Sequence, residues 1–92
     1  MTCVIRLLGR GLKDFKPEAN ILTEKGSFTF RHVFILSENK YKRFTSKKSA
    51  LRYIEIIKET LLEYKDVYEE VSPGSYYRLI VLADNLKVEP EV

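Results

Sequence analysis

The sequence predicts an α+β domain, in which a mainly antiparallel sheet of four to five strands carries one long helix on one face. Three observations lead to this fold class. Apolar and β-branched runs separated by tight-turn residues occupy the first half of the chain, and a stripe at helical spacing crosses residues 50–68. A last strand-like run follows the helix-breaking residues 72–75. The expected order is β-β-β-β-α-β, with a single domain over residues 1–83 and a flexible tail over residues 84–92.

The first strand is expected over Thr2–Leu8, a run of aliphatic residues around Arg6 that ends at the turn Gly9-Arg10-Gly11. Residues 12–20 are polar around two apolar side chains and are expected to form a loop, with one helical turn before Pro17 as an option. A short strand is expected over Ile21–Thr23.

The strongest strand signal is Phe28–Leu36, because aromatic and β-branched residues dominate it. Glu24-Lys25-Gly26-Ser27 is expected to turn the chain into this strand, and residues 37–40 are expected to turn it out again. Tyr41–Phe44 then returns as a short strand and closes a hairpin in this prediction.

The helix is predicted to run from about Lys47 to at least Tyr64, after an N-cap hydroxyl supplied by Thr45 or Ser46. Its apolar stripe repeats at spacings of three and four and consists of Ala50, Ile54, Ile57, Leu61, Tyr64 and Tyr68. Leu51, Tyr53 and Leu62 are expected to widen the stripe. Ser72-Pro73-Gly74-Ser75 ends the helical region, and Tyr76–Ala83 is expected to be the last strand.

Alternation along the expected strands assigns their residues to two faces. The face under the helix should hold Cys3, Ile5, Leu7, Phe28, Phe30, Phe34, Leu36, Tyr77, Leu79 and Val81. The other face should hold Val4, Arg6, Leu8, Thr29, Arg31, Val33, Ile35, Tyr76, Arg78, Ile80 and Leu82. A register slip of one residue would exchange the two sets.

The residue inventory argues against catalytic, metal and membrane functions. One cysteine, Cys3, and one histidine, His32, are too few for a structural zinc site, and a single cysteine forms no internal disulfide. Both fall on the face under the helix, where a buried thiol and a core histidine are favoured over a thiolate–imidazolium pair. The sequence shows no paired carboxylates, no dinucleotide fingerprint and no apolar run long enough to span a bilayer. We therefore expect a cytoplasmic, non-enzymatic protein without metal, cofactor or membrane partner.

Charge is distributed unevenly along the chain. The net charge is +3, but residues 1–52 carry twelve bases and four acids, whereas residues 53–92 carry four bases and nine acids. The segment Lys40–Arg52 concentrates the positive charge, since it has six bases and no acid. Such asymmetry indicates an anionic partner rather than any particular fold.

The basic segment predicts a site for an anionic partner, most simply nucleic acid. Lys47 and Lys48 lie at the expected helix start, where the macrodipole is already positive, so folding alone would favour acids there. Together with Arg43 and the unpaired N–H groups of the first turn, they would form an anion site suited to phosphate. The alternative is an ordinary solvated surface. The predicted binding residues are Lys40, Lys42, Arg43, Lys47, Lys48 and Arg52.

Residues 42–50, KRFTSKKSA, are locally similar to the basic strand and helix start of AP2-type and integrase arm-type DNA-binding domains. The similarity covers about a quarter of the chain, and it implies a hairpin followed by a helix on DNA. The chain departs from the AP2 pattern because the usual tryptophan and glycine features are missing and a further strand is expected after the helix.

A second hypothesis places a binding site on the sheet face away from the helix. Arg6, Arg31 and Arg78 would lie there on three strands beside Tyr76, and arginine among aromatic and aliphatic neighbours is typical of protein interfaces. The protein would then be an adaptor, inhibitor or regulatory subunit, or would pair with a second copy of itself. The alternative is that residues 10–20 or the C-terminal tail cover this face, which would then be part of the core rather than a binding site.

Overall fold

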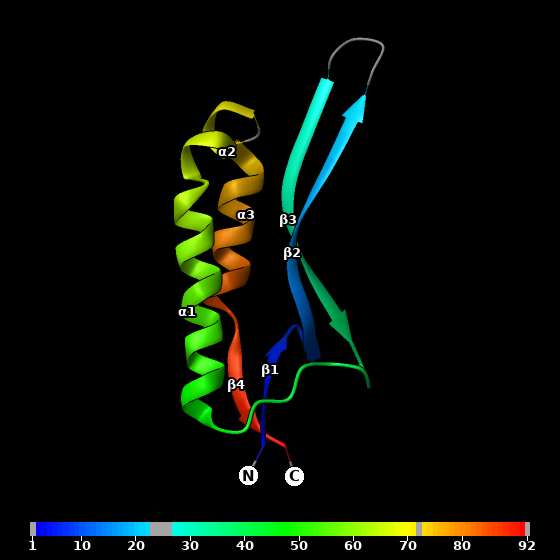
Figure 1. Ribbon diagram of the computed structural model, residues 1–92, viewed down its shortest axis with the longest axis vertical. Coiled ribbons are helices and arrows are strands. Elements are labelled where there is room, and N and C mark those ends of the chain that lie inside the picture. The colour runs from blue at the N-terminus through cyan, green and yellow to red at the C-terminus, as the bar shows by residue number, and fades with distance from the viewer. Residues whose placement is uncertain (1, 23–26, 72, 92) are drawn as a thin grey trace.

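The computed structural model describes residues 2–22, 27–71 and 73–91, with side chains outside 18–31 and 71–73. The α+β class is confirmed, because a four-stranded antiparallel sheet carries three helices on one side (Figure 1). The elements are β1 (Cys3–Leu7), β2 (Arg10–Leu22), β3 (Ser27–Ser37), α1 (Lys47–Glu63), α2 (Lys65–Val71), α3 (Pro73–Asp84) and β4 (Lys87–Pro90). The molecule measures 50 × 23 × 18 Å, and the β2–β3 hairpin projects beyond the helices.

The strand order in the sheet is β3-β2-β1-β4, and each neighbouring pair is antiparallel. Leu8 and Gly9 connect β1 to β2 with φ values of 54° and 78°, the backbone of a two-residue turn that matches strand twist. The register of β2 against β3 shifts between Leu12 and Asp14, which marks a bulge. β1 therefore lies inside the sheet, between β2 and β4.

Two expectations about the first half of the chain were wrong. Residues 12–20 form most of β2 rather than a loop, because pairing with β3 satisfies their backbone despite the polar sequence. Tyr41–Phe44 does not form a strand. Only Phe44 pairs there, through an isolated bridge in which it and Cys3 exchange N–H···O bonds of 2.8 Å. Of the predicted turn before β3, residues 24–26 lie outside the described residues.

The long helix is confirmed. Ser46 is its N-cap, and the Ser46 hydroxyl accepts the backbone N–H of Ser49 at 3.2 Å. The predicted stripe is buried at Ala50, Ile54, Ile57, Leu61 and Tyr68, the last of these on α2, and half-buried at Tyr64. Leu51 and Leu62 are exposed instead of widening the stripe, whereas Tyr53 is half-buried against the core.

The last predicted strand was also wrong, since Tyr76–Ala83 lies within helix α3. Tyr76, Leu79 and Ala83 are buried at helical spacing, whereas Tyr77 and Val81, expected under the helix, are exposed. An uninterrupted apolar run does not distinguish the two periodicities. The remaining strand is β4, formed by residues expected to be a loose tail, and it pairs with β1 so that Val88 faces Ile5.

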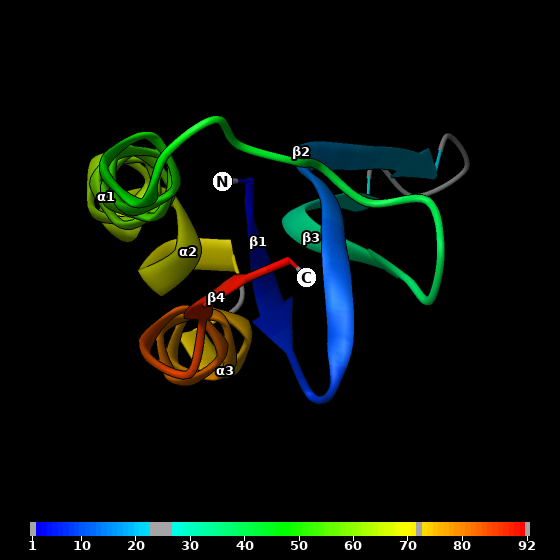
Figure 2. The same cartoon turned by 90° about the horizontal axis from the view of Figure 1, so that it is seen from below.

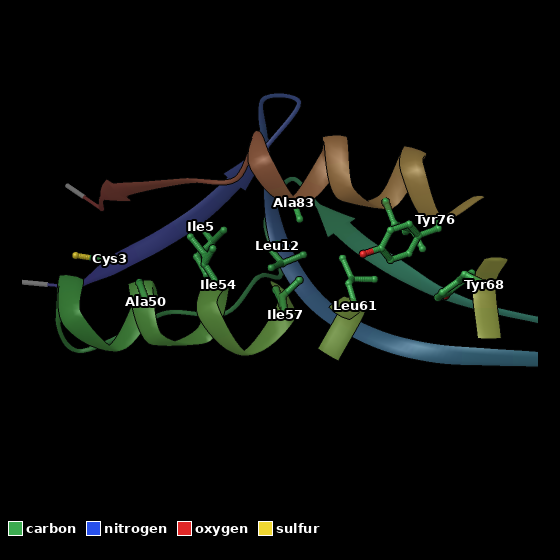
Figure 3. Close-up of a cluster of buried hydrophobic side chains, with 11 residues drawn as sticks. Cys3, Ile5, Leu12, Ala50, Ile54, Ile57, Leu61, Tyr68, Tyr76 and Ala83 are labelled. Atoms are coloured by element: carbon green, nitrogen blue, oxygen red, sulfur yellow. The ribbon is translucent and has the colours of Figure 1, made fainter. Parts of the chain in front are cut away.

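The core lies between the sheet and the helices (Figure 3). Ile5 of β1 and Leu12 of β2 meet Ile54, Ile57 and Leu61 of α1 there. The opposite side of β1 is closed as well, because Val4 is only 1% exposed. Burial on both sides explains why β1 is a nearly continuous apolar strand.

Candidate functional site

The predicted basic segment, Lys40–Arg52, covers most of the connection between β3 and α1 and continues into the first residues of α1. Residues 38–46, here called the crossing segment, pass over the end of the sheet to reach the start of α1 (Figure 2). The Lys42 N–H donates to the Leu12 carbonyl at 3.0 Å, and Phe44 pairs with Cys3. These bonds fix the backbone of the crossing segment against β2 and β1, and they fix where its charges lie.

Tyr41 attaches the crossing segment to the outer face of the sheet. Its ring packs directly on Gly11 of β2, where any side chain would collide with it. Its hydroxyl donates to Glu91 Oε2 at 2.8 Å. Glu91 also joins the two ends of the described chain, because its N–H donates to the Thr2 carbonyl at 2.9 Å.

Two arginines complete this cluster around Tyr41. The Arg43 Nε donates to Glu91 Oε1 at 2.7 Å, and its guanidinium carbon lies 4.8 Å from the Tyr41 ring centroid. Arg6 lies 5.4 Å from the same centroid and forms an ion pair of 3.6 Å with Glu89. The pKa of Glu91 is lowered, first by the hydrogen bond that it accepts from Arg43 and then by the one that it accepts from Tyr41. The same bond to Glu91 raises the pKa of Arg43. Arg43 therefore holds the crossing segment to Glu91, and its positive charge is compensated by that carboxylate.

Arg52 is compensated in the same way. It contacts Glu55 at 3.2 Å and Glu59 at 3.3 Å along α1, and its pKa is raised by the hydrogen bond to Glu55 and by the charge of Glu59. Both arginines among the six predicted binding residues are thus paired with carboxylates. The candidates left for an anionic ligand are Lys40, Lys42, Lys47 and Lys48.

These four lysines are exposed, and within the described residues none of them forms an ion pair. The Lys42 ammonium lies 5.6 Å from the Tyr53 ring centroid, which still leaves it exposed. Lys13 is the residue after Leu12, whose carbonyl accepts the Lys42 N–H. It is also exposed, and it forms no ion pair within the described residues. We call Lys13, Lys40, Lys42, Lys47 and Lys48 the basic strip.

Sequence reasoning missed Lys13 because it assigned this lysine to a loop far from the basic segment. The bond between the Lys42 N–H and the Leu12 carbonyl brings the basic segment beside this part of β2. At the other end of the basic strip, the first turn of α1 has no acidic residue, so the positive end of the helix adds to Lys47 and Lys48.

The predicted arginine face does not form. Arg6 lies on β1, whereas Arg78 is exposed on α3 and Tyr76 is 7% exposed in the core beside Tyr68. Arg31 lies on β3 opposite Glu18 in the register, and its side chain is outside the described part. The three arginines would share a face only if residues 76–83 were a strand.

Cys3 and His32 are both buried, as expected, but they lie at opposite ends of the core. Cys3 starts β1, and His32 bonds to Tyr68, which lies at the other end of the core (Figure 3). Across the described ranges, no cluster of three or more acidic, histidine or cysteine side chains could hold a metal ion. The helices in those same ranges are all too short or too polar to cross a bilayer.

No family model, curated protein or solved structure matches this chain. The local similarity of residues 42–50 to AP2-type and arm-type domains does not extend to structure, since the strand that precedes the helix in those modules is absent here. The fold and the site together define a small α+β protein with a lysine-rich surface.

Proposed function

We propose that this protein is a non-catalytic binding module for a polyanion, with nucleic acid as the first choice, and that the basic strip makes the contact. One observation supports the proposal most directly. The five lysines of the basic strip have no acidic partner among the described residues, whereas the nearby Arg6, Arg10, Arg43 and Arg52 each have at least one. Uncompensated exposed charge contributes little to folding and is available to a ligand.

The kind of charge favours contacts to phosphate rather than to bases. Lysine ammonium groups act as mobile point charges, while bidentate reading of base edges is mainly the work of arginine. The arginines of this region are held by Glu91, Glu55 and Glu59. We therefore expect binding that depends on salt and depends little on sequence.

A salt titration with labelled duplex DNA, single-stranded DNA and RNA tests the proposal. With three to five phosphate contacts on duplex DNA, the slope of log affinity against log salt should lie between about −2.7 and −4.5. Replacing Lys47 and Lys48 with Glu should weaken binding at least tenfold at about 50 mM salt, because two attractive charges become repulsive.

The matched control is the double change Lys65→Glu and Lys87→Glu, which alters net charge equally at two exposed positions outside the basic strip. It should lower affinity by much less. Equal losses in the two double variants would show that net charge, not the basic strip, drives binding. Failure of all three nucleic acids to bind at low salt would remove nucleic acid as the partner.

A further inference from the structure

A half-open groove with a volume of about 250 Å³ lies between β3 and α3. It exists because α3 packs mainly against α1 and α2 and leaves part of the sheet uncovered. Its apolar walls are Leu7, Val33, Phe34 and Leu36 from the sheet and Leu79 and Leu82 from α3. The groove shares no residue with the basic strip.

Leu8 forms an unusual edge of this groove. It is 78% exposed although it is a large apolar residue, and its φ of 54° is a conformation that leucine rarely adopts. Exposure and backbone strain both disfavour leucine at this position for folding alone. Such a residue beside an apolar groove is explained if a ligand covers it.

Arg78 supplies the charge. It is exposed on α3, lines the groove and has no ion-pair partner within the described residues. The lining residues also include His32 and Ser75, but no carboxylate. Six apolar walls with one guanidinium and no acid complement a ligand that is apolar along its length and anionic at one end.

We propose that the groove binds an apolar chain that ends in a carboxylate, with the chain between the sheet and α3 and the carboxylate on Arg78. The volume is just below the ~300–1,000 Å³ typical of small-molecule sites, so a medium-length chain fits better than a long one. A guanidinium can hold both carboxylate oxygens at once, which fixes the orientation of the ligand.

The test uses sodium decanoate as the probe, followed by amide chemical shifts in two-dimensional NMR. Decanol and decyltrimethylammonium serve as neutral and cationic analogues of the same chain. Decanoate should shift amides of Leu8, Leu36, Arg78 and Leu82, and it should bind more tightly than either analogue. Arg78→Gln should raise the decanoate Kd at least fivefold and leave the decanol Kd unchanged, because only the carboxylate contact is lost.

Lys16→Gln is the matched control, since it removes one exposed positive charge outside the groove. It should leave decanoate binding unchanged. A second variant, Leu82→Trp, should fill the groove and abolish the shifts. If that variant does not fold, Arg78→Gln is sufficient for the test, because a change at the exposed Arg78 should leave the fold intact. Three results would overturn the inference: shifts outside the groove, equal affinity for decanoate and decyltrimethylammonium, or no binding up to about 1 mM decanoate.

Discussion

The hydroxyl oxygen of Tyr68 lies 2.8 Å from Nδ1 of His32 and also accepts the backbone N–H of the same histidine. One side chain on α2 thus satisfies two polar groups of β3 in the core, where His32 is only 3% exposed. In the contact with Nδ1, the tautomer of the imidazole sets which of the two atoms donates. The His32 ring also stacks on Phe15, with centroids 5.2 Å apart and an interplanar angle of 11°.

Tyr68→Phe should destabilise the fold by about 1–3 kcal/mol, because it leaves the His32 N–H and Nδ1 without this partner inside the core. Urea unfolding measures the change. Tyr77→Phe is the control, since Tyr77 is exposed and its hydroxyl can bond to water. If both variants lose the same stability, the hydrogen bonds to His32 are not the cause.

Stability should fall as the pH is lowered from about 7 towards 5. Burial lowers the pKa of His32 from its ordinary 6.5, so below that pH the unfolded chain takes up a proton that the folded protein refuses. The slope should not exceed about 1.4 kcal/mol per pH unit. The lowered pKa of Glu91 has a separate window, because its stabilising effect is lost only as pH falls below its ordinary 4.5.

Urea unfolding at several pH values measures this dependence. His32→Gln should flatten the slope above pH ~5 even where it lowers stability overall, because glutamine does not titrate. An unchanged slope in that variant would assign the dependence to other groups.

Gly11→Ala should destabilise the protein by about 1–3 kcal/mol, because its Cβ would collide with the Tyr41 ring that packs on Gly11. Moving Tyr41 also disturbs its bond to Glu91. Thermal and urea unfolding measure the loss. Gly74→Ala is the control, since nothing lies within 4 Å of a Cβ there. In a Tyr41→Ala background, Gly11→Ala should cost much less; an undiminished cost would place the clash elsewhere.

Ser46→Ala should lower stability by about 1 kcal/mol, because it removes the acceptor for the Ser49 N–H at the start of α1. Thr45→Ala precedes the cap and should change stability little. The helical circular dichroism signal followed through thermal unfolding distinguishes the two. Equal effects would mean that the hydroxyl of Ser46 does not act as the cap.

Replacing Lys47 and Lys48 with Glu should raise stability at low salt by about 0.3–1 kcal/mol per residue, because acids suit the positive end of a helix. The same double variant should bind nucleic acid more weakly. Stability and affinity would then move in opposite directions, as expected for charges retained for binding. A stability loss on unfolding by urea would instead mean that these lysines have acidic partners.

Local features of the sequence are enough to specify α1 and the uneven distribution of charge. Both depend on local information, namely a hydroxyl N-cap and apolar residues three or four positions apart, which no distant contact needs to supply. The fold class followed, because one amphipathic helix among strand-like segments leaves few ways to bury an apolar stripe. The lysines of the basic segment could also be identified locally, because lysine side chains are almost always exposed and their positions can be read directly from the sequence.

The secondary structure of residues 76–83 and the pairing of the arginines depend instead on tertiary contacts. An apolar run fits a strand or a helix equally well, and packing of Tyr76, Leu79 and Ala83 into the core selected the helix. β2 is polar enough to resemble a loop, and only pairing with β3 makes it a strand. Arg43 is compensated by Glu91, which lies 48 positions further along the chain. Contacts at such separation depend on how the whole chain folds, so no local pattern encodes them.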